Sequence, residues 1–337
     1  MKSRLNVGVV GLGRMGRVYA INLAQRVPNA RLVAVADIQA DVAEAFARDY
    51  GVPKWYKCHH DLINDKDIAA VVVVAPTSKH KEVVIEAAKS GKAIFCEKPM
   101  STSLQEAEQM LKAVAAAGVF FQAGFQRRFD AGYVAAKKKI EAGEIGTVVL
   151  FQSTSRDPFR PSLEYCDPKV SGGMISDFGI HDFDLARMYM GEVKSVYAIG
   201  GTLAYPEMKP IGGIDNAVIS MVFQNKELGV VQLSLNAVFG YDIRAELWGT
   251  KGSLQIGYHR ETPILVMTKE GITHDVVPYF MQRFERAYVA QIQDFVDSVL
   301  LDRLPSVTGA DGVAAMRISL AGTKSFEENR PVEISEI

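Results

Sequence analysis

The sequence predicts an α/β protein with two domains, and three observations support that prediction. Short apolar runs alternate with helical patterns over residues 5–123, as in a doubly wound parallel sheet. Later runs change to a period of two, as in a large, mostly antiparallel open sheet that is covered on one face. The chain has 337 residues, enough for two hydrophobic cores. We therefore predict one domain over residues 1–125 and a second over residues 126–337.

Residues 5–24 predict a strand, a tight turn and a helix. An apolar run, Val7 to Val10, is followed by Gly11, Gly13 and Gly16 at the spacing G-x-G-x-x-G. The first glycine allows the turn, the second leaves room for a pyrophosphate, and the third lets the helix pack closely. The amide groups at the helix start then stabilise the anion. This pattern predicts dinucleotide binding, with Arg14 and Met15 in the same turn.

The end of the second predicted strand favours NAD over NADP. Residues 31–36 lead into Asp37, whose carboxylate can hydrogen-bond the ribose hydroxyls of an adenosine. That carboxylate would repel a 2′-phosphate, and Ile38 supplies no compensating cation. The alternative is a structural turn in which Asp37 caps the next helix.

The remaining elements of the first domain follow in alternation: helix 39–50, strand 68–74, helix 79–90, strand 93–96, helix 103–117 and strand 119–123. In parallel sheets of this kind, ligands bind beyond the carboxyl ends of the strands. One crevice should therefore collect Gly11, Asp37, Thr77 and Lys98. Ala75, His80 and Glu97 are further predicted cofactor contacts.

The second domain is predicted to begin with a helix over 130–142 and a strand over 148–154. A polar loop then leads into a helix that starts near Asp177. The period-two segments of the predicted sheet are 193–200, 215–224, 231–236, 242–248 and 263–268. Helices over 283–301 and 309–326 end the chain.

Composition excludes several function classes. The net charge is -1, so no broad attraction to nucleic acid or to an anionic membrane is expected. No apolar run approaches the length of a membrane span. Residues 1–4 lead straight into a strand, which leaves no room for a signal peptide. The three cysteines, Cys58, Cys96 and Cys166, form neither a disulfide framework nor a zinc pattern. A cytoplasmic protein is expected.

His59 and His60 lie in a predicted polar loop beside Cys58. No second pair of ligands follows at a suitable spacing, so we predict that they are loop residues and that the chain has no metal site.

Three residues are candidates for catalysis. Lys98 precedes a proline at a strand end, where it could polarise a substrate oxygen or help to take its proton. Asp177 and His181 have the spacing i,i+4 of one helix face, where a carboxylate can orient an imidazole that acts as general base. Lys98 could instead be a surface lysine, Asp177 a helix cap and His181 a core histidine.

Three further residues have simpler explanations. Asp182 and Asp184 lie near the positive end of the predicted helix, and favourable dipole contacts account for them. Tyr241, between two predicted strands, suits a substrate contact and a structural role equally well.

Three motifs together resemble the Gfo/Idh/MocA oxidoreductase family: the glycine turn 11–16, Glu97-Lys98-Pro99, and residues 171–182. The likeness is strongest to its inositol 2-dehydrogenases, through residues 126–130, 155–158, 179–184 and 291–295. The resemblance implies an N-terminal Rossmann domain that binds NAD, a C-terminal α/β domain with an open sheet, and homotetramers in which the sheets pack together.

The resemblance also assigns residues. Lys98, Asp177 and His181 match the catalytic trio, and the first of these also matches a cofactor contact. Asp157 and Tyr241 match the polyol pocket, and Arg127 matches a position near the cofactor and the substrate. Ser155 stands where some inositol dehydrogenases carry histidine, which leaves the stereoisomer open. The residues also leave open whether the bond before Pro99 is cis.

The predicted function is NAD-dependent oxidation of a ring hydroxyl of myo- or scyllo-inositol, or of a related cyclic polyol or sugar, by hydride transfer. Two alternatives stay open. One is a glycosidase or epimerase of the same family that retains its NAD, and the other is a non-catalytic NAD-binding regulator.

Overall fold

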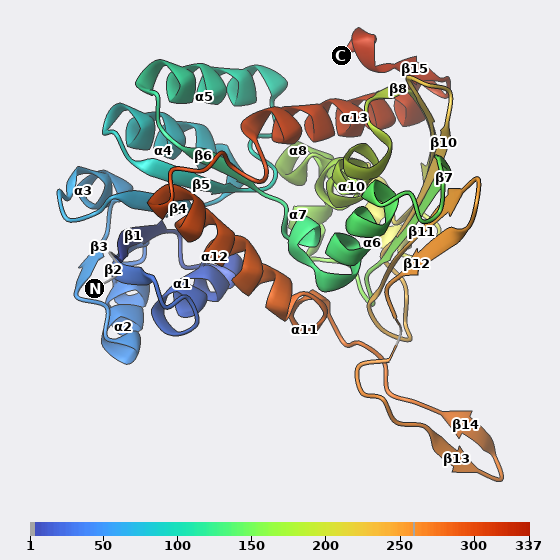
Figure 1. The fold of residues 1–337 in the computed structure, drawn as a ribbon, viewed down its shortest axis with the longest axis horizontal. Helices are drawn as coiled ribbons and strands as arrows, with labels where there is room; N and C mark the ends of the chain where they lie inside the picture. The colour runs from blue at the N-terminus through green and yellow to red at the C-terminus, as the bar shows by residue number, and fades with distance from the viewer. Residues whose placement is uncertain (1–3, 259) are drawn as a thin grey trace. The chain divides into compact units, whose positions relative to one another are not determined.

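The computed structural model describes residues 4–258 and 260–337 (Figure 1). The prediction that residues 1–4 leave no room for a signal peptide rests mainly on residues 1–3, which lie outside the described residues. The chain forms two compact units. The first contains the residues up to 129 together with 286–313, and the second contains 130–285 and 314–337. A segment near the C-terminus therefore returns to the first unit.

The first unit is built on a six-stranded sheet in the order β3-β2-β1-β4-β5-β6, and each strand pair is parallel. This order is that of a doubly wound nucleotide-binding sheet, so the predicted fold class is confirmed for this part. The strands are β1 (Leu5–Val10), β2 (Ala30–Ala36), β3 (Lys54–Tyr56), β4 (Ala70–Val73), β5 (Ala93–Glu97) and β6 (Phe121–Gly124).

The helices of the first unit are α1 (Arg14–Gln25), α2 (Ala40–Tyr50), α3 (His59–Asn64), α4 (Thr77–Lys89), α5 (Leu104–Ala117), η1 (Gln126–Phe129) and α12 (Glu285–Leu300). Helix α12 belongs to this unit because its aromatic side chains pack against it. Phe295 lies 5.8 Å from Phe95 of β5, and Tyr288 lies 5.9 Å from Tyr19 of α1, between ring centroids. His59 and His60 begin α3, so the prediction that they lie in a loop is wrong.

The second unit contains a seven-stranded sheet in the order β12-β11-β7-β10-β9-β8-β15. Only β7 and β10 pair in parallel among its described strands, which confirms the mostly antiparallel sheet. The strands are β7 (Val148–Arg156), β8 (Val193–Gly201), β9 (Asn216–Phe223), β10 (Leu228–Ser234), β11 (Asp242–Gly249), β12 (Ser253–Ile256) and β15 (Val332–Glu333).

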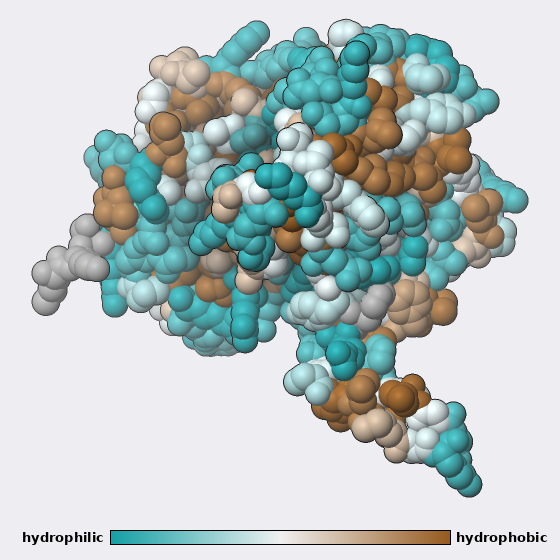
Figure 2. All heavy atoms as spheres, turned by 45° about the vertical axis from the view of Figure 1, so that its right-hand side comes forward, coloured by the Kyte–Doolittle hydropathy of each residue, from teal (hydrophilic) through white to brown (hydrophobic). Residues whose placement is uncertain are grey.

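The predicted strand 263–268 does not join this sheet. Its last residues form β13 (Val266–Thr268), which pairs with β14 (Gly271–Thr273) in a two-stranded sheet. Figure 2 shows hydrophobic side chains gathered on that hairpin, and Ile264, Met267 and Ile272 are among its exposed residues. The alternating pattern is present, but neither face of the hairpin is buried.

The helices and helical turns of the second unit are α6 (Ala131–Glu141), α7 (Leu163–Cys166), α8 (Pro168–Ser171), α9 (Gly173–Asp177), α10 (Ile180–Met190), η2 (Pro206–Ile211), α11 (Phe280–Arg283), most of α13 (Gly309–Glu328) and η3 (Ile334–Glu336). The two predicted C-terminal helices correspond to α12 and α13. None of the helices described over 4–258 and 260–337 is both long enough and apolar enough to cross a bilayer.

The single helix predicted to start near Asp177 is instead two helices. Asp177 is the last residue of α9, and α10 begins three residues later. The chain turns at Gly179, whose amide reaches back to the Met174 carbonyl at 3.2 Å and so shifts the helical hydrogen-bond register. A Cβ at Gly179 would lie 2.6 Å from the Ile175 carbonyl oxygen. Asp177 therefore neither shares one regular helix with His181 nor caps its start.

Candidate active site

The glycine turn between β1 and α1 has the geometry of a phosphate site. Gly11 has a φ of +94°, and a Cβ there would lie 2.7 Å from the Val74 carbonyl oxygen. A Cβ at Gly16 would lie 1.9 Å from the Gly11 oxygen. Gly13 caps α1, and a Cβ there would meet nothing within 4 Å. Close packing therefore surrounds an open position at a helix N-terminus, which suits the pyrophosphate of a dinucleotide.

Arg14 and Met15 begin α1 directly beside that open position, and Arg14 is exposed. The N-cap glycine has no side chain to accept hydrogen bonds from the first-turn amides of α1.

The Asp37 carboxylate connects the end of β2 to the glycine turn. One oxygen accepts a hydrogen bond from the Leu12 amide at 2.8 Å, and the other accepts from the Gln39 amide at 2.9 Å. Gln39, not Asp37, is the N-cap of α2, so the capping alternative is wrong. Each carboxylate oxygen has further acceptor capacity for a ribose hydroxyl. Ile38 beside it is 82% exposed.

The turns after β4 and β5 are joined by His80. Its ring is buried, with Nε2 2.8 Å from the Ala75 oxygen and Nδ1 3.0 Å from the Pro99 oxygen. Burial lowers the pKa of His80, while the hydrogen bonds to these carbonyl oxygens act in the opposite direction. His80 therefore positions the two turns, whereas Thr77 begins α4 beside them. The Lys98–Pro99 bond, left open by the sequence, is cis.

Glu97 holds the backbone at Lys98. Its buried carboxylate accepts a hydrogen bond from the Lys98 amide at 2.7 Å and another from the Tyr19 hydroxyl at 2.5 Å. Burial, together with the charge of Glu97, raises the pKa of Tyr19 well above its usual value, so the phenol remains a donor. Arg127 lies in η1 and is 1% exposed.

Because β2, β1, β4 and β5 are neighbours and parallel, their carboxyl ends form one edge of the sheet. The structure thus brings together the residues that were predicted to follow these strands: Gly11, Asp37, Ala75, Thr77, Glu97 and Lys98.

The other predicted residues belong to the second unit. Asp177 lines a small pocket together with Tyr165, Cys166 and Met208. His181, in the first turn of α10, is 8% exposed.

Asp157 and Tyr241 flank strands of the large sheet. Asp157 directly follows β7, and its amide donates to the Ser234 carbonyl at 2.9 Å. Tyr241 directly precedes β11 and is buried against Tyr279 and Phe284, with ring centroids 5.8 and 6.3 Å away. Tyr241 therefore has an aromatic packing role.

Sequence reasoning missed a buried network beside His181. Asp182 is fully buried and accepts hydrogen bonds from the Ser155 hydroxyl at 2.8 Å and from the Ser153 hydroxyl, both on β7. Helix-dipole contacts alone therefore do not explain Asp182, because it joins α10 to the sheet. Ser153 and Ser155, which share one face of β7, were a weak sequence signal for this network, because their partner Asp182 lies on another element.

A parallel sheet of this strand order with an open glycine turn at a helix N-terminus has the architecture of a dinucleotide-binding protein. The chain belongs to the Gfo/Idh/MocA family. Residues 5–125 match its "Oxidoreductase family, NAD-binding Rossmann fold" domain. Residues 137–334 match its "Oxidoreductase family, C-terminal alpha/beta domain". The predicted family, the Rossmann domain and NAD as cofactor are confirmed.

The chain is similar over its length to named relatives. It is 38% identical over 335 residues to scyllo-inositol 2-dehydrogenase (NAD(+)) of Bacillus subtilis, covering 99% of this chain and 97% of the relative. It is also 38% identical to myo-inositol 2-dehydrogenase of Thermotoga maritima, covering 99% of each. A solved structure of scyllo-inositol dehydrogenase from Lactobacillus casei with bound NAD(H) and scyllo-inositol superposes with a TM-score of 0.94 at 31% identity, covering 99% of this chain and 100% of that one.

Proposed function

We propose that this protein is an NAD-dependent dehydrogenase that oxidises a ring hydroxyl of myo- or scyllo-inositol to the keto-inositol. The observation that carries the proposal is the end-to-end similarity to inositol 2-dehydrogenases, including one solved with NAD(H) and scyllo-inositol bound. A related cyclic polyol or sugar is the wider substrate class.

The cofactor contacts are proposed for one edge of the parallel sheet. The open position at Gly13, between the close-packed Gly11 and Gly16, fits the pyrophosphate, and the Asp37 oxygens fit the ribose. The remaining proposed contacts are Arg14, Met15, Ile38, Ala75, Thr77, His80, Glu97, Lys98 and Arg127. His80 and Glu97 contribute by holding the turns on which the others lie.

In the proposed reaction, His181 removes the proton of the substrate hydroxyl, and Asp177 orients the imidazole. Lys98 holds the substrate oxygen, while Arg127, Asp157 and Tyr241 contact the rest of the ring. Bound NAD would supply the acceptor for the hydride of the carbon that carries this hydroxyl. The low exposure of His181 and the firm support of Lys98 by Glu97 favour these roles.

The proposal is tested by following NADH absorbance with myo-inositol, scyllo-inositol and several hexoses. We expect turnover with an inositol, and a larger thermal shift with NAD than with NADP. His181→Ala and Lys98→Ala should each lower kcat/KM by about 10²- to 10⁴-fold. Unchanged kcat/KM in both variants would reject the mechanism. Turnover of glycosides without net NADH would indicate an NAD-retaining enzyme, and NAD binding without any turnover would indicate a regulator.

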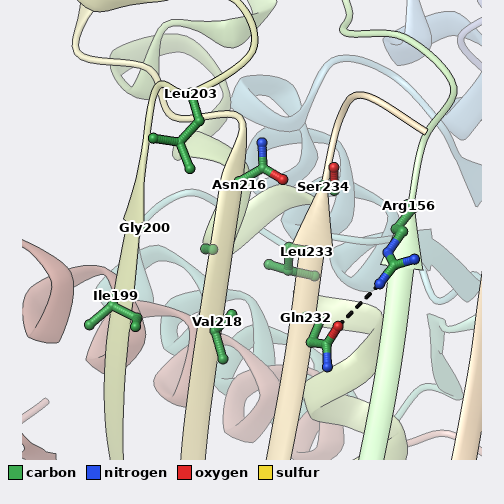
Figure 3. Close-up of a pocket in the computed structure, with 10 residues that line it drawn as sticks. Arg156, Ile199, Gly200, Leu203, Asn216, Val218, Gln232, Leu233 and Ser234 are labelled. Atoms are coloured by element: carbon green, nitrogen blue, oxygen red, sulfur yellow. Dashed lines mark hydrogen bonds between the residues drawn. The ribbon is translucent and has the colours of Figure 1, made fainter. Parts of the chain in front are cut away.

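We also propose a homotetramer assembled through the outer face of the seven-stranded sheet. Figure 3 shows a pocket on β8, β9 and β10, and its volume is about 350 Å³. Apolar side chains around it are exposed: Ile199 by 51%, Val218 by 41% and Leu203 by 78%. An exposed apolar sheet face of this kind is typical of an interface. The cysteines are free thiols, which suits the proposed cytoplasmic location.

A further inference from the structure

Two consecutive histidines at the start of α3 face two glutamates on α4. His59 Nε2 lies 3.4 Å from Glu86 Oε2 and 3.5 Å from Glu82 Oε1. His60 Nδ1 contacts the other oxygen of Glu86. One ligand atom from each of His59, His60 and Glu86 lies within 4.8 Å of the others. We call these three residues and Glu82 the α3–α4 cluster.

The position of His59 Nε2 is that of a metal ligand. The atom is buried, and no described residue forms a hydrogen bond with it. A water or an ion can satisfy a buried polar atom that forms no hydrogen bond. Its distances to the two carboxylates, 3.4 and 3.5 Å, are long for hydrogen bonds. They are close to the ligand-to-ligand separation of about 3.4 Å in a tetrahedral site with bonds of about 2.1 Å, whereas the shorter contact between His60 and Glu86 must lengthen to admit an ion.

The charges of the cluster favour a divalent cation. Glu86 lies in the last turn of α4, where the negative end of the helix dipole stabilises a positive charge. Lys79 donates to Glu82 Oε2 at 3.0 Å and so leaves Oε1 directed toward His59. Two imidazoles with carboxylates form the ligand set of zinc and similar ions, whereas Mg²⁺ and Ca²⁺ prefer oxygen ligands alone.

We propose that His59, His60 and Glu86 bind a divalent transition-metal ion of the Zn²⁺ class, with Glu82 or water as the fourth ligand. The ion links α3 to α4 and stabilises the first unit. The sequence hid this site because Glu86 comes from a different helix, and only the packing of α3 on α4 adds it to the histidine pair. The proposal does not depend on the proposed dehydrogenase activity, because none of its ligands has a role there.

The experiment titrates Zn²⁺ into the full-length chain after chelation, by calorimetry and by thermal unfolding. We expect one equivalent bound per chain and a higher Tm, with no such shift from the same concentration of Mg²⁺. Co²⁺, used as a spectroscopic probe, should give the visible absorption of a tetrahedral nitrogen and oxygen site.

Single variants locate the site. His59→Gln, His60→Gln and Glu86→Gln should each weaken Zn²⁺ binding about tenfold or more and remove the Co²⁺ absorption. His60→Gln guards against a folding defect, because that side chain is 64% exposed. His274→Gln, an exposed histidine outside the cluster, is the matched control and should bind like the wild type. Absence of stoichiometric binding, or equal affinity in all four variants, would overturn the proposal and leave a histidine–glutamate ion pair.

Discussion

At the scale of single residues, the hydrogen bond from the Lys98 amide to Glu97 leads to a testable prediction. Tyr19→Phe removes the hydroxyl that donates to the buried Glu97 carboxylate but keeps the ring 5.1 Å from Phe95. We expect a stability loss of about 1–3 kcal/mol in urea unfolding, because a buried acceptor loses its donor. We also expect kcat/KM to fall severalfold, since Glu97 holds the Lys98 amide.

Tyr189→Phe is the matched control for Tyr19→Phe. It removes another buried tyrosine hydroxyl, one that donates to the Tyr133 carbonyl at 2.7 Å. This control should lose stability while keeping the wild-type kcat/KM. Equal kcat/KM in both variants would contradict a positioning role for Tyr19.

The sequence predicted individual residues well where the chemistry is local. Gly11 and Gly16 have the predicted close packing and Gly13 the predicted open space, because a turn and a helix start are set by neighbouring residues. The bond from Ser155 to Asp182 was not predictable in the same way, since it joins a strand to a helix that comes later in the chain. Glu86 was missed as a partner of His59 for the same reason.

At the scale of elements, a single buried carboxylate orders the loop between β8 and β9. Asp215 accepts hydrogen bonds from the amides of Leu203, Ala204 and Tyr205, at 2.8, 2.9 and 2.6 Å. Burial by itself would raise the pKa of Asp215, but these amides and the Asn216 side chain together lower it. The loop therefore depends on the ionised carboxylate.

Asp215→Asn should destabilise the protein by about 1–3 kcal/mol at neutral pH, because the amide cannot accept all of these bonds. The folded pKa is below the unfolded one, so the wild-type advantage is full above the unfolded value of about 3.9. It is lost as the pH falls through the folded pKa. Urea unfolding of both proteins from pH 7 to pH 3 measures this difference, and a constant gap down to pH 3 would contradict it.

Elements were predicted where their periodic pattern agreed with burial. The strands β1, β2, β4, β5 and β6 meet that condition, and so do β9 and β10, whose residues alternate between buried and less buried. The short strand β3 and the helix α3 were not predicted. The failures have local causes. The turn at Gly179 divides one predicted helix in two, and the exposed β13–β14 hairpin has a strand pattern without a buried face.

At the scale of the whole molecule, the proposed tetramer gives the outer face of the sheet a partner. Val218 of β9 is 41% exposed and Ile199 of β8 is 51% exposed, although the two residues pair with each other in the sheet. Removing apolar surface from water would stabilise the assembly by about 25 cal/mol for each Å² that is buried. Subunit contact through this face would bury side chains that an isolated chain leaves in water.

Val218→Lys places a charge on that face, and the cost of burying it should shift the protein from tetramers to smaller species. Sedimentation equilibrium of both proteins measures the change, and the Tm of the variant should lose its dependence on protein concentration. Leu304→Lys is the matched control, because Leu304 is 89% exposed in a loop outside the sheet. This control should remain tetrameric. A wild-type protein that is monomeric at micromolar concentration, or a Val218→Lys variant that assembles like it, would reject this face as the interface.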